Sequence, residues 1–90
     1  MLFVMLASPR GASFKEAIPR RLQWSPPEGV RPVAEYWLMT PKPTTIAIFE
    51  ADDVAPIMAI AADWDDLYAI TVVPAVTAEQ GMEMAKKMMG

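Results

Sequence analysis

The sequence contains neither cysteine nor histidine. Without cysteine the chain cannot form a disulfide, a thiolate zinc site or an iron–sulfur cluster, and it has no thiol nucleophile. Without histidine it lacks the commonest general base near neutral pH, the commonest transition-metal ligand and the usual proximal ligand of haem. Any chemistry must therefore come from carboxylates, hydroxyls, lysine or arginine, and we expect no cofactor, no metal site and no catalytic constellation.

Positive charge is also scarce, because eight basic residues face eleven acidic ones and the net charge is −3. This balance argues against the basic surface that nucleic-acid binding requires. The charge is unevenly spread. Residues 1–45 hold six basic and three acidic residues, a net +3, whereas residues 46–90 hold two basic and eight acidic residues, a net −6. The asymmetry favours docking of the first half on the second, within one chain or across a dimer.

No long hydrophobic run is present. The apolar run Met1 to Ala7 is too short to span a membrane and has no basic leader of the kind found in secretory signals. We therefore expect a cytoplasmic protein that makes no membrane contact, and we interpret this run as the first β-strand.

Four segments have the composition of strands within one domain that covers residues 1–90. Residues 2–7 and 44–49 are largely apolar or β-branched, which is typical of central strands covered on both faces. The segments 32–39 and 67–73 contain or adjoin charged residues and prolines, so they are predicted to be edge strands.

Three segments have helical patterns. Ser13 with Glu16 forms a capping-box signature, and Pro19 is expected to kink or split the helix that follows. The second helix is expected to begin with Asp53 as its N-cap, which places Pro56 in the first turn. Thr77 with Gln80 predicts a third, methionine-rich helix. The predicted buried stripes are Phe14, Ala17, Ile18 and Leu22 in the first helix and Ile57, Met58, Ile60 and Ala61 in the second.

The order of these elements predicts an α+β fold, a ferredoxin-like βαββαβ antiparallel sheet with an extra C-terminal helix. Two helices cover one face of such a sheet and leave the other bare. Because the strands are apolar on both faces, we expect the bare face to be covered by the C-terminal helix or by a second chain. A homodimer is the simplest arrangement of the latter kind.

Three short segments carry a resemblance to a known family: Pro-Pro-Glu-Gly-Val at 26–30, Ala-Ala-Asp-Trp-Asp-Asp-Leu at 61–67 and Val-Val-Pro-Ala-Val at 72–76. Together with the element order they resemble a prokaryotic family catalogued as a domain of unknown function. That family is similar to the dimeric α+β barrel superfamily, in which two ferredoxin-like sheets pack face to face. The resemblance implies a dimeric α+β barrel.

The resemblance also implies a range of activities. The superfamily includes cofactor-independent monooxygenases, isomerases, haem-binding proteins and ligand-sensing modules. Related chains often carry a histidine near the position of Leu38, after an aromatic residue such as Trp37. This sequence has no histidine there, which argues against a histidine-based activity.

Two charged clusters have a functional and a structural interpretation. Asp63, Asp65 and Asp66 offer oxygen ligands for a hard cation, but their spacing does not fit an EF-hand loop. The favoured interpretation is a solvated loop that Trp64 anchors in the core. The adjacent pair at 20–21, both arginines, is suited to an anion clamp, although a solvated face or a bridge to the acidic half is favoured.

The second strand holds Glu35, Tyr36 and Trp37, and alternation places Glu35 with Trp37 on one face and Tyr36 on the other. The methionines of the last helix, with Met39 and Met58, suit either an adaptable binding surface or gap filling in the core or between two chains.

Two functions follow from these residues. The favoured one is a dimeric module that binds a small apolar or anionic ligand between sheet and helices. The alternative is a cofactor-independent monooxygenase- or isomerase-type enzyme in which Glu35 or Tyr36 handles protons, and it requires Glu35 to lie in a closed pocket with a raised pKa. The candidate ligand-binding residues are Glu35, Trp37, Phe49, Trp64 and Tyr68.

Overall fold

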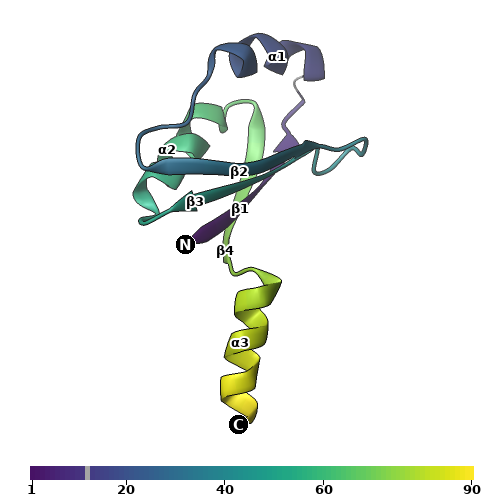
Figure 1. Cartoon of the computed structure of the whole chain (residues 1–90). Coiled ribbons are helices and arrows are strands. Elements are labelled where there is room, and N and C mark those ends of the chain that lie inside the picture. Colours follow the sequence, from purple (N-terminus) through teal and green to yellow (C-terminus); the bar gives the residue numbers. More distant parts are fainter. Residues whose placement is uncertain (12) are drawn as a thin grey trace.

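The computed structural model describes residues 1–11 and 13–90 of the chain. The elements follow the predicted order and are drawn in Figure 1. They are β1 (Leu2–Pro9), α1 (Phe14–Gln23), β2 (Val30–Trp37), β3 (Thr45–Ala51), α2 (Ala55–Trp64), β4 (Tyr68–Ala75) and α3 (Ala78–Met89).

The four strands form one antiparallel sheet in the order β2-β3-β1-β4. The two largely apolar strands, β1 and β3, are central, and the two strands with charge or proline are at the edges, as predicted. Proline is tolerated at an edge because its missing N–H need not face a neighbouring strand. The fold is α+β and ferredoxin-like, with an added C-terminal helix, and the fold prediction is confirmed.

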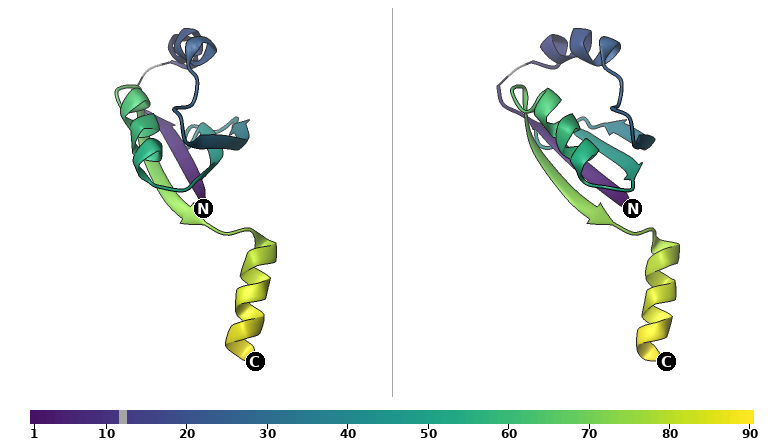
Figure 2. Two further views of the ribbon diagram at one scale, coloured as in Figure 1. Left: turned by 60° about the vertical axis from the view of Figure 1, so that its left-hand side comes forward. Right: turned by 90° about the vertical axis from the view of Figure 1, so that its left-hand side faces the viewer.

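One face of the sheet carries the core. Phe3, Met5 and Phe49 are buried on this face and pack with Ile57 and Ile60 of α2. Figure 2 shows α2 lying along the sheet, while α1 stands at the far end of the same layer. Strand residues alternate between buried and partly exposed along β1 and β3, as a sheet with helices on one side requires.

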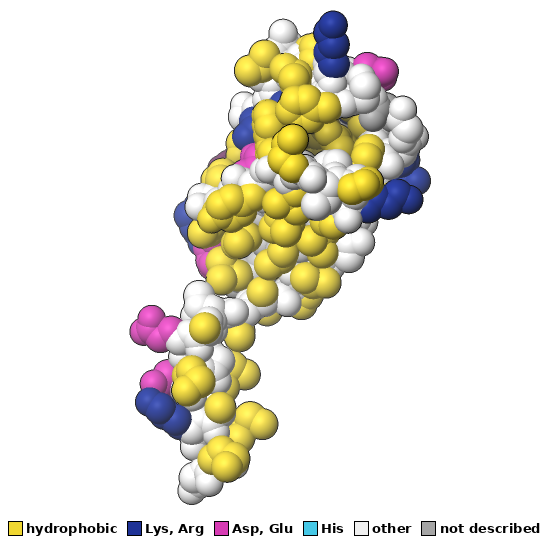
Figure 3. Space-filling view, turned by 90° about the vertical axis from the view of Figure 1, so that its right-hand side faces the viewer, with side chains coloured by type: hydrophobic (Ala, Val, Ile, Leu, Met, Phe, Trp, Pro, Cys, Tyr) yellow, Lys and Arg dark blue, Asp and Glu magenta, His cyan; other side chains and the backbone are white. Residues whose placement is uncertain are grey.

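The other face of the sheet is apolar and uncovered. Its side chains follow from the register, in which Val4 pairs with Ile48 on one side and Val73 on the other. Hydrophobic side chains gather over this face in the space-filling view of Figure 3. The residues directed to this face are Leu2, Val4 and Leu6 of β1, Ile46 and Ile48 of β3, Ala34 and Tyr36 of β2, and Ala69, Thr71 and Val73 of β4. We call these residues the open sheet face.

The helix α3 does not cover the open sheet face. It points away from the sheet in every view, and none of its residues is buried. The radius of gyration of 15.0 Å exceeds the roughly 12 Å typical of a compact domain of this length. The sequence predicted that either the C-terminal helix or a second chain covers this face. The first of these two alternatives is wrong.

Helix α1 confirms its predicted start but not its predicted stripe. The Ser13 hydroxyl accepts a hydrogen bond from the Glu16 backbone N–H, 3.2 Å away, as an N-cap does. The helix runs through Pro19 without a break, so of the expected kink or split at this residue the split is wrong. Leu22 is 80% exposed, because the inward face runs through Ala17 and Arg21 instead.

Helix α2 begins one residue later than expected. Val54 is the N-cap residue, although the Asp53 carboxylate still accepts a hydrogen bond from the Ala55 backbone N–H at 3.0 Å. Ile57 and Ile60 are buried as predicted, whereas Met58 is 64% exposed. The prediction that Met58 belongs to the buried stripe is wrong. Met58 follows Ile57 by one residue and therefore lies beside the sheet-facing side of the helix, not on it.

None of the helices in residues 1–11 and 13–90 combines the length and the apolar character needed to cross a membrane. The longest, α3, begins with the predicted capping box: Thr77 and Gln80 exchange side-chain-to-backbone hydrogen bonds of 3.0 and 3.1 Å.

The orientation of α2 can be tested by two neighbouring truncations. Ile57→Ala removes a fully buried side chain and should lower the free energy of unfolding by about 2–5 kcal/mol. Met58→Ala removes a mostly exposed one and should change it by less than about 0.5 kcal/mol. Urea unfolding followed by far-ultraviolet circular dichroism measures both, and equal losses would contradict this orientation.

Candidate functional site

A cavity of about 80 Å³ lies between α1 and the helix-covered face of the sheet. All five candidate ligand-binding residues line it. The structure thus brings together the five side chains that the sequence analysis selected. The full lining is Met5, Ala7, Phe14, Ala17, Arg21, Trp24, Glu35, Trp37, Thr45, Ala47, Phe49, Ile60, Trp64, Tyr68 and Ile70.

The space exists because three small residues meet there. Ala7 of β1, Ala17 of α1 and Ala47 of β3 are all buried and all line the cavity. Large aromatic side chains surround them, so the short alanine side chains leave a volume that no neighbour fills.

Helix α1 lines the cavity with a face of which the predicted stripe contains only Phe14 and Ala17. Phe14, Ala17, Arg21 and Trp24 are spaced by three, four and three residues, so they lie on one side of the helix and line the cavity. The missed signal is that the inward face contains an arginine and a tryptophan. A search for purely apolar residues selected Leu22 and passed over Arg21.

A β-bulge directs the polar wall of the cavity. Pro32 pairs with Phe49 and Ala34 pairs with Ile48, so Val33 is an extra residue in β2. Before the bulge Val30 is buried on the helix side. Without the extra residue, simple alternation from Val30 would turn Glu35 outward to the open sheet face. The bulge reverses the phase and aims Glu35 into the cavity.

Glu35 is held by two hydrogen-bond donors. The Arg21 guanidinium donates from Nη2 to Oε1 at 2.7 Å and from Nε to Oε2 at 3.2 Å. The Trp37 indole donates from Nε1 to Oε2 at 2.6 Å. The Arg21 bonds lower the pKa of Glu35 most, burial opposes them, and the Trp37 bond lowers it further.

This environment contradicts the requirement of the enzyme alternative. Glu35 does face the cavity, with 28% of its side chain exposed, but its pKa is lowered rather than raised. A carboxylate that is already ionised and paired is a weak proton acceptor and is not an acid near neutral pH. Tyr36, the other proposed proton carrier, lies on the open sheet face and does not line the cavity.

Tyr68 supplies a second polar group. Burial raises the pKa of its phenol, and the nearby charge of Glu35 raises it further. The hydroxyl therefore stays protonated at neutral pH. The Tyr68 side chain lines the cavity, so its phenol is a candidate partner for a molecule bound there.

An aromatic pair stands at the opening. The rings of Phe14 and Trp37 meet edge to face, with centroids 5.2 Å apart and planes at 78°. Both side chains line the cavity, and both are more than half exposed. They therefore lie where the cavity reaches solvent, and their contact connects α1 with β2.

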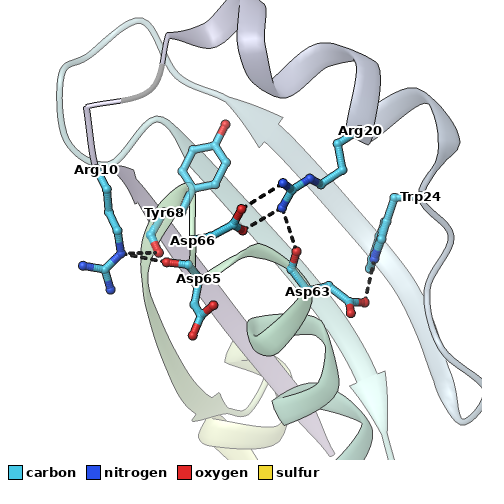
Figure 4. A network of polar contacts seen from close by, with 7 residues as sticks. All are labelled: Arg10, Arg20, Trp24, Asp63, Asp65, Asp66 and Tyr68. Carbon is cyan, nitrogen blue, oxygen red and sulfur yellow. Dashed lines mark hydrogen bonds and ion pairs between the residues drawn. The ribbon is translucent and has the colours of Figure 1, made fainter.

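The far end of α1 is attached to the loop between α2 and β4, as Figure 4 shows. Arg20 forms two bonds with the Asp66 carboxylate, at 2.7 and 2.9 Å, and a third with the Asp63 carbonyl at 3.0 Å. The Trp24 indole donates to the Asp63 carboxylate at 3.0 Å. The bonds from Arg20 lower the pKa of Asp66. The predicted docking of the basic half on the acidic half is seen here within one chain.

These contacts also account for the acidic cluster. Asp63 and Asp66 bind side chains of α1, and Trp64 between them is buried, as the favoured interpretation predicted. Arg10 donates to the backbone carbonyls of Asp65 and Tyr68. No group of three acidic residues in the described part of the chain is arranged to hold a metal ion.

Chemically, the cavity offers a wall of aromatic rings and two polar groups. The ionised Glu35 accepts hydrogen bonds, and the Tyr68 hydroxyl donates or accepts them. This set can bind and orient a small molecule.

One family model, described as "Domain of unknown function (DUF3303)", matches residues 1–89. The match covers nearly the whole chain and agrees with the sequence resemblance to a family of that kind. The searches of curated proteins and of solved structures gave no significant match.

The pairing of Arg21 with Glu35 predicts that the low pKa of Glu35 depends on Arg21. A carboxylate with a lowered pKa stabilises the fold above its unfolded-state pKa, near 4.3, and this stabilisation is lost as the pH falls through the folded-state pKa. Arg21→Gln should therefore raise the pKa of Glu35, measured by carbon-13 NMR of the side-chain carboxyl.

The matched control is Arg20→Gln, which should raise the pKa of Asp66 and leave that of Glu35 unchanged. A wild-type Glu35 that titrates at or above its ordinary pKa would contradict the pairing.

Proposed function

The chain belongs to the DUF3303 family, a domain of unknown function, so we propose its function from the cavity alone. We propose that this protein is a module that binds a small, uncharged, mostly apolar molecule beneath α1. The observation that carries the proposal is an aromatic cavity with a single ionised carboxylate, Glu35, in its wall. Clefts of this composition, apolar with a few convergent polar groups, are typical of small-molecule sites.

The charges favour a neutral ligand over an anion. Arg21 is the one cation in the lining, and its guanidinium is already paired with Glu35. An anion would have to break this pair and then face an unpaired carboxylate. A hydroxyl or N–H group on a neutral ligand can instead donate to Glu35 or exchange a hydrogen bond with Tyr68. Of the two ligand classes expected from the sequence, we therefore favour the apolar one.

The size of the cavity implies that α1 moves when a ligand binds. A cavity of about 150 Å³ accommodates benzene, whereas this one has about 80 Å³. Ala17 is the one buried residue among those of α1. The helix is attached at its rim by Arg20, Arg21 and Trp24 rather than by deeply packed side chains. A small outward shift of α1 enlarges the space and leaves the core of the sheet and α2 intact.

Binding without catalysis suits the polar groups better than the enzyme alternative. Glu35 has a lowered pKa and Tyr68 a raised one, so neither exchanges a proton readily near neutral pH. Both groups are suited to hold a ligand in one orientation.

We also propose that the protein is a homodimer in which the open sheet faces of two copies pack against each other, as in a dimeric α+β barrel. The support is the row that runs across the sheet from Ala34 through Ile48 and Val4 to Val73. A contiguous apolar sheet face of this kind is ordinarily covered in soluble proteins. A two-fold axis lets each copy cover the other with the same residues.

Phenol tests the ligand class, because it combines one ring with one hydroxyl donor. We expect wild-type protein to bind phenol with a Kd of about 1 mM or tighter, measured by NMR chemical-shift titration, with the largest shifts at the tryptophan indoles of the cavity. Ala17→Leu fills the cavity and should weaken binding at least about tenfold. Ala59→Leu, on the exposed side of α2, is the control and should leave the Kd unchanged.

Benzoate distinguishes the neutral from the anionic ligand class. It should bind wild-type protein at least about tenfold more weakly than phenol, because Glu35 repels it. Glu35→Gln removes that charge and frees Arg21, so the preference should shrink or reverse. Tighter binding of benzoate than of phenol to the wild type would refute the choice of a neutral ligand.

The dimer can be tested by one charge on the open sheet face. Ile48→Glu places a carboxylate at its centre and should shift the sedimentation velocity from that of two chains to that of one. Ala59→Glu adds the same charge to the exposed side of α2 and should leave the dimer intact. Circular dichroism checks that both variants fold. Wild-type protein that sediments as a single chain at a concentration of about 100 µM would contradict the proposal, because a dimer with a Kd well below that value is populated there.

A further inference from the structure

The helix α3 presents a complete apolar side that contacts no other element. At about 100° per residue its apolar residues fall within an arc of about 160°, and its charged residues lie on the opposite side. The methionines on the apolar side are between 53% and 88% exposed. We call the following residues the α3 stripe: Ala78, Gly81, Met82, Met84, Ala85, Met88 and Met89.

A helix of this length is not stable by itself. Isolated helices shorter than about 12–15 residues are marginal in water, and α3 has twelve residues. Its local support consists of the Thr77–Gln80 capping box and one exposed pair, Lys86 with Glu83 at 3.4 Å. Such exposed pairs contribute little. Stable helix formation therefore needs burial of the α3 stripe against another surface.

A short connection joins α3 to the sheet. The chain leaves β4 at Ala75 and enters the helix at Ala78, so Val76 and Thr77 alone connect the two. Val76 precedes the N-cap and its Cγ2 lies 3.9 Å from the point where a Cβ on Gly81 would be. Gly81 has no side chain, so no hydrophobic staple forms between the N′ and N4 positions, and the direction of α3 follows from the two-residue connection.

The α3 stripe and the open sheet face point to the same side of the molecule. In Figure 3 the hydrophobic side chains of α3 face the viewer together with those of the sheet, and its charged side chains project away from them. One body placed against this side can touch both surfaces.

The area of the open sheet face favours a second copy of this chain as the molecule that touches both surfaces. Four strands of about eight residues span a planar area of about 500 Å². Stable interfaces bury about 800 Å² on each partner. The α3 stripe, about 18 Å long and about 10 Å wide, supplies roughly 180 Å² more. A second copy that contacts both the sheet and α3 covers a footprint of roughly 680 Å², about a third more than one seated on the sheet alone, and so forms a larger interface.

The charges and side chains argue against a membrane. Glu79 and Glu83 balance Lys86 and Lys87, so α3 has no net charge, and the whole chain carries −3. Helices that lie on anionic bilayers are usually rich in basic residues and carry tryptophan, phenylalanine or leucine on the apolar side. The stripe contains none of these three, and its flexible methionines suit a protein surface.

We propose that α3 extends the dimer interface: the α3 stripe of each protomer packs against the surface of a second copy of this chain. We call this contact the clasp. The proposal rests on the dimer proposed above and assigns to α3 a part of the interface that the sheet does not provide.

Isotope-filtered NMR tests the clasp on the whole chain. Protein labelled with carbon-13 at its methionine methyl groups is mixed with unlabelled protein, and NOEs from labelled to unlabelled chains are recorded. We expect intermolecular NOEs from the methyl groups of Met84 and Met88. A dimer in which these methyls give no intermolecular NOE overturns the clasp and leaves the sheet-to-sheet dimer standing, whereas a wild-type monomer overturns both.

A pair of variants adds a thermodynamic test. Met84→Glu with Met88→Glu charges the α3 stripe and should weaken the dimer at least about tenfold by analytical ultracentrifugation. Lys87→Glu changes the net charge by the same amount on the opposite side of α3 and should change the Kd by less than about threefold. Equal Kd values for the two variants, or burial of the α3 methyls in phosphatidylcholine–phosphatidylglycerol vesicles instead of a second chain, would overturn the clasp.

Discussion

The bulge at Val33 is the constraint on which the candidate site depends. One extra residue in β2 reverses the direction of every side chain that follows it in the strand, and Glu35 is thereby turned from the open sheet face into the layer beneath α1. There it meets Arg21, and the resulting ion pair links α1 to the edge of the sheet. Without the bulge neither the polar wall of the cavity nor this attachment of α1 would form.

The attachment of α1 explains why a cavity persists in a protein with a small core. The helix is held along its rim by the Arg21–Glu35 pair, the Arg20–Asp66 pair and the Trp24–Asp63 hydrogen bond. None of these contacts fills the space beneath the helix. In α2, by contrast, Ile57 and Ile60 are fully buried, and the sheet beneath them is closely packed. The chain thus combines a buried core between the sheet and α2 with a helix, α1, that is attached at its rim over the cavity.

Much of the fold could be predicted from the sequence, because strand order follows from composition. Uniformly apolar segments became central strands, and charge and proline marked the edges. Alternation places Phe49 and Tyr68 on the helix-covered face, and α2 brings Trp64 to the same cavity. Glu35 and Trp37 reach it because of the bulge.

The sequence could not predict which side of each helix faces inward or the direction in which α3 leaves the sheet. The inward face of α1 includes a charged residue, Arg21, whose place depends on a partner, Glu35, that only the bulge provides. The position of Met58 depends on the angle at which α2 crosses the sheet. The projection of α3 away from the sheet depends on the short connection through Val76 and Thr77. Each of these is set by a contact between distant or locally irregular residues, and periodicity does not record such contacts.

The described part of the chain leaves the cavity beneath α1, the open sheet face and the α3 stripe for other molecules to fill. Native mass spectrometry of the purified 90-residue chain tests this most directly, because it reports the number of chains and any retained small molecule in one spectrum. The account predicts a species of twice the 9.9 kDa chain mass with the mass of a small ligand added. A bare single chain of 9.9 kDa, at concentrations where the protein is folded, would contradict it.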